Sequence, residues 1–344
     1  MSFLHTHSSE CIKSELDFFS LPPTQTSIES SQWIYYKPVT SLTDDSPIEF
    51  VIPGHGEDYL DLTHTMLSLR IRVESERGES TSVAATDVAK AGPVNHLLHS
   101  MFNQIDVYFN QKLVSQPNNA YAYRAYIEAL LNYASPAKTS HLTSCLWDAD
   151  IPVYMDDMLD SSNPNTALER RAKYIQGNRA LDLVGHLHCD VFNQDKFLIN
   201  GVEVRMRLVR SKDSFCLMET RTMSKIHADV VGESIDNAIL GQLPKRIIVG
   251  FVDNKAFNGD RKLNPFNFKN YKIFVDGTLF AFDLTPDLSA NCAGHWNLVK
   301  HGSLRLEVRF EKALSVTINC TIYAEFDNVL KIDSSRQVIV DFSG

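Results

Sequence analysis

Two pairs of histidines have a spacing that could bind a metal ion. His186 and His188 stand two residues apart, which places both on one face of a predicted strand, whereas Cys189 alternates to the opposite face. His96 and His99 stand three residues apart, as on one face of a helix, yet the sequence places no carboxylate or third ligand beside them. We therefore interpret both pairs as structural or surface histidines and assign no metal ligand.

An acidic cluster follows the glycine-containing loop at residues 53–56. Glu57, Asp58 and Asp61 carry carboxylate oxygens, which Ca²⁺ prefers as ligands. Their spacing differs from the alternating acidic pattern with a central glycine that forms a calcium-binding loop. A solvated loop is the favoured interpretation.

Three other short motifs have ordinary structural interpretations. The basic group at residues 170–173 could touch DNA, but a solvated helix face is favoured. The triplet Asn319-Cys320-Thr321 matches a glycosylation acceptor, yet it lies inside a predicted strand. The Asn-Pro-Phe sequence at 264–266, followed by Phe268 and Tyr271, predicts an aromatic plug at the corner of a β-sandwich.

The usual sequence signatures of catalysis are missing. The sequence contains no G-x-x-x-x-G-K-S/T, G-x-G-x-x-G, G-x-S-x-G or H-E-x-x-H pattern, which argues against the common nucleotide-binding, hydrolase and zinc-protease sites. We therefore expect a protein that is not an enzyme. We assign no catalytic residue, no cofactor-binding residue and no cofactor.

The composition is that of a folded protein with an acidic surface. Of the 344 residues, 44% are hydrophobic and 22% are charged, and the length is enough for about two domains. The formal net charge of −9 makes the surface as a whole repel nucleic acid and anionic membranes. We expect no direct sequence-specific binding of nucleic acid and no membrane partner.

The cysteines and the N-terminus indicate an intracellular protein. The six cysteines stand singly, without a C-x-x-C pair, which favours reduced and mostly buried thiols. They are Cys11, Cys145, Cys189, Cys216, Cys292 and Cys320. The first residues lack the basic start and apolar stretch of a signal peptide, and no run approaches the length of a membrane span. We expect no secretion, and the sequence does not distinguish nucleus from cytoplasm.

Apolar and polar residues alternate through most of the chain, which predicts half-buried β-strands. The clearest segments are 67–73, 105–109, 181–191, 202–208, 304–310 and 316–326. Asp276-Gly277 lies between two apolar runs and predicts a hairpin turn, and Asn200-Gly201 and Asn258-Gly259 are similar. Closely spaced strands without long intervening helices predict antiparallel sandwiches and argue against a parallel βαβ fold.

Breaks in this pattern suggest the organisation of the chain. Helical spacing of apolar residues from Tyr123 to Leu131 predicts an amphipathic helix, and residues 167–175 predict a second, weaker one. The polar N-terminal residues predict a mobile arm, after which a first strand begins at Trp33. The periodicity lapses between Thr222 and Asn237. We therefore expect a flexible arm at 1–31, a first sandwich at 32–222 and a second at 223–344.

Several strings taken together resemble the major capsid protein of Polinton/Maverick transposable elements and the related adintoviruses. In the first half they are residues 53–62 (PGHGEDYLDL), 95–104 (NHLLHSMFNQ), 200–204 (NGVEV) and 210–218 (RSKDSFCLM). In the second half they are 241–246 (GQLPKR), 264–268 (NPFNF), 282–287 (FDLTPD), 302–306 (GSLRL) and 323–326 (YAEF). The match runs from Trp33 to Phe342, and ordered strings of this kind are more specific than one short motif.

The resemblance implies an all-β double jelly roll, in which two eight-stranded antiparallel sandwiches stand side by side with short helices in the connecting loops. It also implies self-association into homotrimers that form pseudo-hexagonal capsomers of a capsid lattice, with a penton or minor capsid protein as a further partner, and location in the virion. The chain departs from the family after Met218, where the connection to Gly241 is short. From Thr222 onward the sequence predicts about six strands. We therefore expect a shortened copy with an incomplete second jelly roll.

Two functions follow from these observations. The leading one is a structural capsid subunit that self-assembles. The alternative is a domesticated or decayed copy that acts as a jelly-roll module for binding a ligand or a protein, because the same architecture serves both purposes. A viral, a transposon-borne and a host-domesticated source all fit the sequence.

Overall fold

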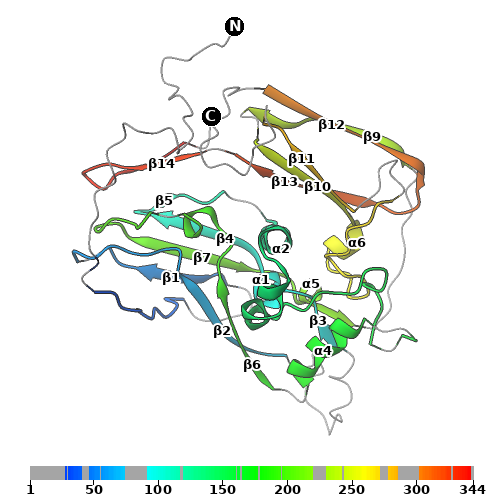
Figure 1. Ribbon diagram of the computed structural model, residues 1–344, viewed down its shortest axis with the longest axis horizontal. Coiled ribbons are helices and arrows are strands. Elements are labelled where there is room, and N and C mark those ends of the chain that lie inside the picture. The colour runs from blue at the N-terminus through cyan, green and yellow to red at the C-terminus, as the bar shows by residue number, and fades with distance from the viewer. Residues whose placement is uncertain are drawn as a thin grey trace.

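The computed structural model describes most of the chain and separates it into two β-rich halves (Figure 1). The described residues are 28, 30–40, 46–54, 56–73, 91–116, 119–159, 161–162, 165–176, 179–194, 196–219, 230–241, 244–271, 278–285, 302–326 and 328–341. We call residues 46–219 the N-terminal half and residues 230–341 the C-terminal half. In the described part, no helix is long and apolar enough to cross a membrane.

A four-stranded antiparallel sheet forms the base of the N-terminal half. Its order is β1 (Ile48–Ile52), β7 (Val204–Arg210), β4 (Phe102–Phe109) and β5 (Lys112–Leu113). Val204, Met206 and Leu208 of β7 are buried, whereas Arg205 between them is exposed. This alternation follows from the two-residue period of a strand, so the face predicted from the sequence is confirmed.

Two further strand pairs and several short helices complete the N-terminal half. β2 (Met66–Arg72) pairs with β6 (Ala180–His186), and β3 (Ala91–Pro93) pairs with β8 (Leu217–Glu219). The helical segments are α1 (Leu97–Ser100), α2 (Tyr121–Asn132), α3 (Ser135–Lys138), η3 (His141–Cys145), α4 (Thr166–Ile175), η5 (Asp190–Phe192) and α5 (Asp213–Cys216). The two longer helices, α2 and α4, are those that the sequence predicts.

The C-terminal half is a two-layered sandwich in its described part. One layer is β11 (Leu279–Asp283), β10 (Arg246–Asp253) and β13 (Ile318–Glu325), in that order. The other is the pair β9 (Val230–Gly241) and β12 (Gly302–Leu314). Ile247, Val249 and Phe251 of β10 face a small core that Leu304 and Leu306 of β12 complete.

The central strand β10 is buried on both faces and joins the two halves. Ile248 and Val252 alternate with the residues above and belong to the large core of the N-terminal half. After β10 come α6 (Asn254–Phe257) and a loop whose Phe266 is 1% exposed. The Phe266 ring stacks on Tyr126 of α2, with centroids 4.3 Å apart and planes 4° from parallel. The predicted burial of these aromatic residues is confirmed, but Phe266 packs on α2, between the two halves, instead of at the corner of a sandwich.

The last hairpin returns to the N-terminal half. β14 (Val329–Ile332) pairs with β15 (Val338–Asp341). Val338 belongs to the N-terminal core, and the Arg336 carbonyl accepts a hydrogen bond of 2.9 Å from the Asn110 side chain. The described C-terminal half therefore contains seven strands where the sequence predicts about six, and two of them pack on the other half.

Several expectations from local pattern are wrong. The residues around Trp33 form no strand, and the first strand of the described residues is β1. β6 ends at His186 instead of continuing to Val191, because the chain turns into η5. Asn258-Gly259 follows the end of α6 instead of joining two strands, and Gly259 has a φ of +85°.

Other expectations fall outside the described residues or agree with them. Most of the predicted N-terminal arm, the Asp276-Gly277 turn, Cys11 and Cys292 lie outside the described residues. The other four cysteines are free thiols; Cys145, Cys189 and Cys216 are buried and Cys320 is half-buried. Glu57, Asp58 and Asp61 are exposed, as expected for side chains of a solvated loop.

Candidate functional site

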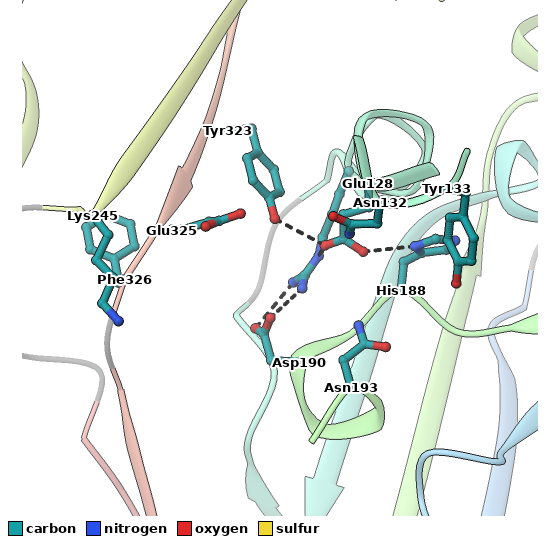
Figure 2. Close-up of a pocket in the computed structure, with 11 residues that line it drawn as sticks. Glu128, Asn132, Tyr133, His188, Asp190, Asn193, Lys245, Tyr323, Glu325 and Phe326 are labelled. Carbon is teal, nitrogen blue, oxygen red and sulfur yellow. Dashed lines mark hydrogen bonds and ion pairs between the residues drawn. The ribbon is translucent and has the colours of Figure 1, made fainter. Parts of the chain in front are cut away.

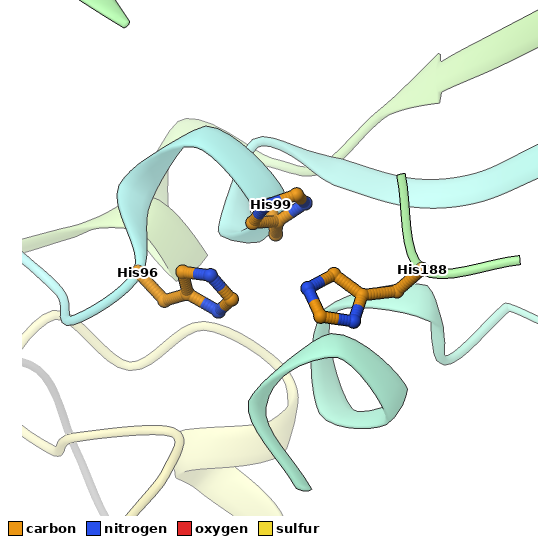
Figure 3. A group of neighbouring side chains, drawn as sticks. All are labelled: His96, His99 and His188. Carbon is orange, nitrogen blue, oxygen red and sulfur yellow. The ribbon is translucent and has the colours of Figure 1, made fainter. Parts of the chain in front are cut away.

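Three histidines from two distant parts of the sequence meet in the core of the N-terminal half. His96 and His99 are each 1% exposed and His188 is 7% exposed. The ring centroids lie 4.2 Å apart for His96 and His99, 4.7 Å for His99 and His188, and 5.5 Å for His96 and His188. Figure 3 shows the three rings facing one another. One ligand atom from each ring lies within 4.8 Å of the others. We call these residues the histidine cluster.

His96 and His99 lie at the two ends of the short helix α1, and His96 has an unusual backbone conformation. His96 caps α1 with a φ of 59° and a ψ of 47°, in the left-handed region that non-glycine residues rarely occupy. The Asn95 side-chain oxygen accepts the backbone N–H of His96 at 2.8 Å and that of Asp148 at 2.9 Å. Strain of this kind costs about 1–3 kcal/mol and persists where surrounding contacts hold it.

A glycine lets strand β6 pass beside the cluster. A Cβ atom at Gly185 would lie 2.3 Å from the Cys145 sulfur and 3.4 Å from Nε2 of His99. No real Cβ atom tolerates the first distance, so any side chain at this position would displace its neighbours. β6 then carries the chain past the cluster, and His188 follows two residues after the strand ends.

Two of the three rings are oriented by hydrogen bonds from α2. Nδ1 of His188 lies 2.8 Å from Oε2 of Glu128, and Nδ1 of His99 lies 2.9 Å from the Tyr121 hydroxyl. The same hydroxyl accepts the backbone N–H of His188 at 3.2 Å. His96 differs, because both of its ring nitrogens are buried and have no hydrogen-bond partner among the described residues.

Burial and neighbouring charges set the protonation of the cluster. Burial, with the nearby His188, lowers the pKa of His96 well below its usual value, and burial with the neighbouring histidines does the same for His99. Burial opposes ionisation of Glu128, yet the His188 hydrogen bond and the charge of Arg124 outweigh it and lower the Glu128 pKa. The site therefore combines neutral imidazoles at His96 and His99 with an ionised Glu128 carboxylate.

A polar cleft of about 480 Å³ borders the cluster on the side of Glu128 and His188. Figure 2 shows α2 on one side of this cleft and β13 on the other. Arg124 bridges Glu128, at 2.8 Å, and Asp190. Tyr323 of β13 donates to Glu128 at 3.4 Å, so the C-terminal half contributes to the network.

The structure revises the interpretation of both histidine pairs. His186 is exposed and His188 is buried, because the strand ends between them, so the prediction that they share a face is wrong. His188 provides a third imidazole beside His96 and His99, which the sequence around these two residues does not contain. No local spacing reveals this partner, because the two segments meet only through the packing of β6 and α2 around α1.

The basic group on α4 is also corrected. Arg171 is wholly buried, and its guanidinium lies 2.6 Å from Asp150 in an ion pair whose two side chains are fully buried. Arg170 is exposed and pairs with Asp148 at 2.6 Å. A solvated helix face therefore describes Arg170 and Lys173, but it is wrong for Arg171.

Of three comparisons with known proteins, the one with solved structures indicates the type of fold. No protein-family model matches the chain. An uncharacterized protein of Caenorhabditis elegans is 20% identical, and the match covers 93% of this chain and 99% of that protein. Among solved structures, a chain from the 3.5 Å cryo-EM structure of the Sputnik virophage matches with a TM-score of 0.52 and 10% identity, covering 99% of this chain and 94% of the virophage chain. At this identity the likeness shows the fold alone, and it is a mostly β, viral capsid-like jelly-roll fold.

Proposed function

We propose that this chain is a structural capsid subunit that associates with copies of itself into trimeric, pseudo-hexagonal capsomers. The observation that carries the proposal is the structural likeness to a virophage chain over 99% of this chain. A likeness confined to one sandwich would fit many binding modules, because the jelly roll serves many functions. A likeness that spans both halves favours a shared architecture of the whole subunit.

Rigid connection of the two halves supports this role. The stacked pair Tyr126 and Phe266 lies between the halves, and Asn264 of the C-terminal half donates to the buried Asp150 carboxylate at 3.0 Å. Asp156 also accepts from Lys269 at 2.7 Å. A lattice subunit must present several contact surfaces in fixed relative positions, and these contacts hold the halves as one block.

An exposed apolar segment before β1 offers a surface for self-association. Trp33 is 74% exposed and Tyr35 is 78% exposed, and Ile34 and Val39 beside them are also exposed. Contiguous exposed apolar side chains are a hallmark of surfaces that bind another protein. We assign this segment, residues 33–39, to contact with a neighbouring copy of the chain.

The proposal also includes the lineage of the capsid protein. The strings that resemble Polinton/Maverick and adintovirus capsid proteins support membership of that lineage, a non-enzymatic role, a penton or minor capsid partner and a place in the virion. The polar cleft between α2 and β13 is the observation that supports the alternative function, a domesticated copy that binds a ligand.

Light scattering coupled to size-exclusion chromatography tests the proposal directly. The full chain should show a species with three times the monomer mass of 38.8 kDa, and its fraction should rise with protein concentration. Electron microscopy should show particles with threefold symmetry. A monomer at every concentration up to the solubility limit would overturn the proposal, and a monomer that copurifies with a small molecule would favour the ligand-binding module.

Paired surface variants test the assigned contact. The double variant Trp33→Ala/Tyr35→Ala should lower the trimer fraction, because it removes two exposed aromatic side chains without touching the core. Tyr174→Ala is the matched control, since Tyr174 is 57% exposed on α4 and lies outside the segment. Equal trimer fractions for both variants would exclude the segment from the interface.

A further inference from the structure

We propose that His96, His99 and His188 together bind a divalent transition-metal ion, Zn²⁺ in the first place, at a buried structural site. The inference is independent of capsid assembly, because it concerns the interior of one subunit. Imidazole nitrogen is a common zinc ligand, and a zinc site with three histidines takes a water molecule as its fourth ligand. One candidate nitrogen from each ring lies within 4.8 Å of the others, so small side-chain rotations would bring all three around one ion.

The hydrogen bonds around the cluster are those of a metal site. A metal-bound histidine usually donates its other ring N–H to a carboxylate or another acceptor, which fixes the tautomer and the ring. His188 places Nδ1 against the Glu128 carboxylate, and His99 places Nδ1 against the Tyr121 hydroxyl. With protons on both Nδ1 atoms, the Nε2 lone pairs of His188 and His99 are available as ligands.

His96 supplies an independent observation. Its ring is fully buried and neither ring nitrogen has a hydrogen-bond partner among the described residues. An unpaired buried polar group costs about 1–3 kcal/mol, and His96 also has a strained left-handed backbone. Figure 3 shows its ring directed toward the other two histidines. A metal ion would give this ring the partner that the protein does not provide.

The elements that carry the ligands indicate what the ion does. His96 and His99 belong to the α1 turn, and His188 belongs to the segment between β6 and η5. Glu128 and Tyr121 connect both to α2. An ion held by all three rings would cross-link these elements, and the role we infer is stabilisation of the N-terminal half.

Metal analysis of the full chain, purified without a polyhistidine tag, is the first test. Elemental analysis should find about one zinc per chain, and EDTA should remove it. Zinc at a thousand times its Kd raises the ratio of folded to unfolded protein about a thousandfold. For a chain of 344 residues this corresponds to a rise in Tm of about 6 °C. Wild-type protein with no zinc and no change in Tm on adding zinc or EDTA would overturn the proposal.

Two variants distinguish zinc binding at the histidine cluster from adventitious binding at surface histidines. His188→Ala should lose the zinc, whereas His186→Ala, which alters an exposed histidine two residues earlier, should retain it. Equal loss in both variants would assign the metal to surface histidines and refute the site. If His188→Ala does not fold, the visible absorption of the Co²⁺-loaded wild type distinguishes the two cases, because tetrahedral or five-coordinate Co²⁺ absorbs much more strongly than the octahedral, hydrated ion expected at surface histidines.

His96→Phe provides the sharpest contrast. Phenylalanine keeps a planar ring but has no nitrogen. If the cluster binds zinc, this variant should lose both the metal and the zinc-dependent rise in Tm. If the cluster is only a set of buried rings, the Tm of the variant should equal or exceed that of the wild type, because the substitution removes two unpaired nitrogens. The Tm of the wild type should then not change when zinc is added.

Discussion

The substitution Asp150→Asn should strongly destabilise the protein, although asparagine has nearly the same shape as aspartate. The Asp150 carboxylate accepts from Arg171 at 2.6 Å, from Asn165 at 2.8 Å and from Asn264 at 3.0 Å. Arg171 has no exposed surface, and its Nε and one terminal nitrogen donate to the carbonyl oxygens of Pro93 and Asp148. Asp150→Asn therefore leaves a guanidinium charge in the core without its counter-ion.

The expected size follows from this burial. Removing one partner of a buried ion pair costs about 3–5 kcal/mol, because the remaining charge stays desolvated. A folded domain is stable by only about 5–15 kcal/mol. With an unfolding entropy of about 2.1 cal/mol/K per residue, the loss lowers Tm by roughly 4–7 °C.

Urea unfolding followed by circular dichroism measures the loss, and a double-mutant cycle isolates the pair. Arg171→Met alone should also destabilise, since Asp150 then keeps only its two asparagine donors. The double variant Asp150→Asn/Arg171→Met should lose less than the sum of the single variants, because no isolated charge remains. Additive losses, or an Asp150→Asn protein as stable as the wild type, would refute the reasoning.

Three further predictions can be checked by the same unfolding measurements. Val204→Asp should cost several kcal/mol because Val204 is 0% exposed, whereas Arg205→Asp should cost much less, and equal losses would contradict the assigned face. Gly54→Ala should cost about 1–3 kcal/mol, because its Cβ would lie 2.5 Å from a backbone atom of Val202; wild-type stability would contradict this. Burial lowers the pKa of His96 in the folded state. In EDTA, the free energy of unfolding should therefore be highest above about pH 6.5, the pKa of an unperturbed histidine. It should decrease by up to about 1.4 kcal/mol per pH unit as the pH falls toward the pKa of folded His96. His96→Phe should flatten that dependence, and an unchanged slope would contradict it.

The strand faces could be predicted because they depend on short-range periodicity. The alternation around Val204 indicates the buried face, and the structure confirms it. The amphipathic spacing of α2 indicates a helix, which the structure also contains. Both patterns are local, since neighbours in the sequence determine which side chains share a face.

The first strand and the buried arginine could not be predicted in this way. The aromatic residues at 33–36 have the composition of a strand, yet no other strand pairs with them in the described residues. Strand formation requires a partner, which composition does not specify. Arg171 lies on the inner face of α4 because Asp150 offers a counter-ion there, and this compensation is invisible without the tertiary contact.

The sequence by itself determined that the chain is mostly β, that its strands have one apolar face, and that the common catalytic signatures are missing. Only the tertiary structure decided which distant residues meet. His188 joins His96 and His99 because β6 pairs with β2, Gly185 leaves room beside Cys145, and Glu128 of α2 holds the third ring. The physical reason is that side-chain periodicity fixes the direction of a residue relative to its own element, whereas a site needs several elements placed to within a few ångströms by long-range packing.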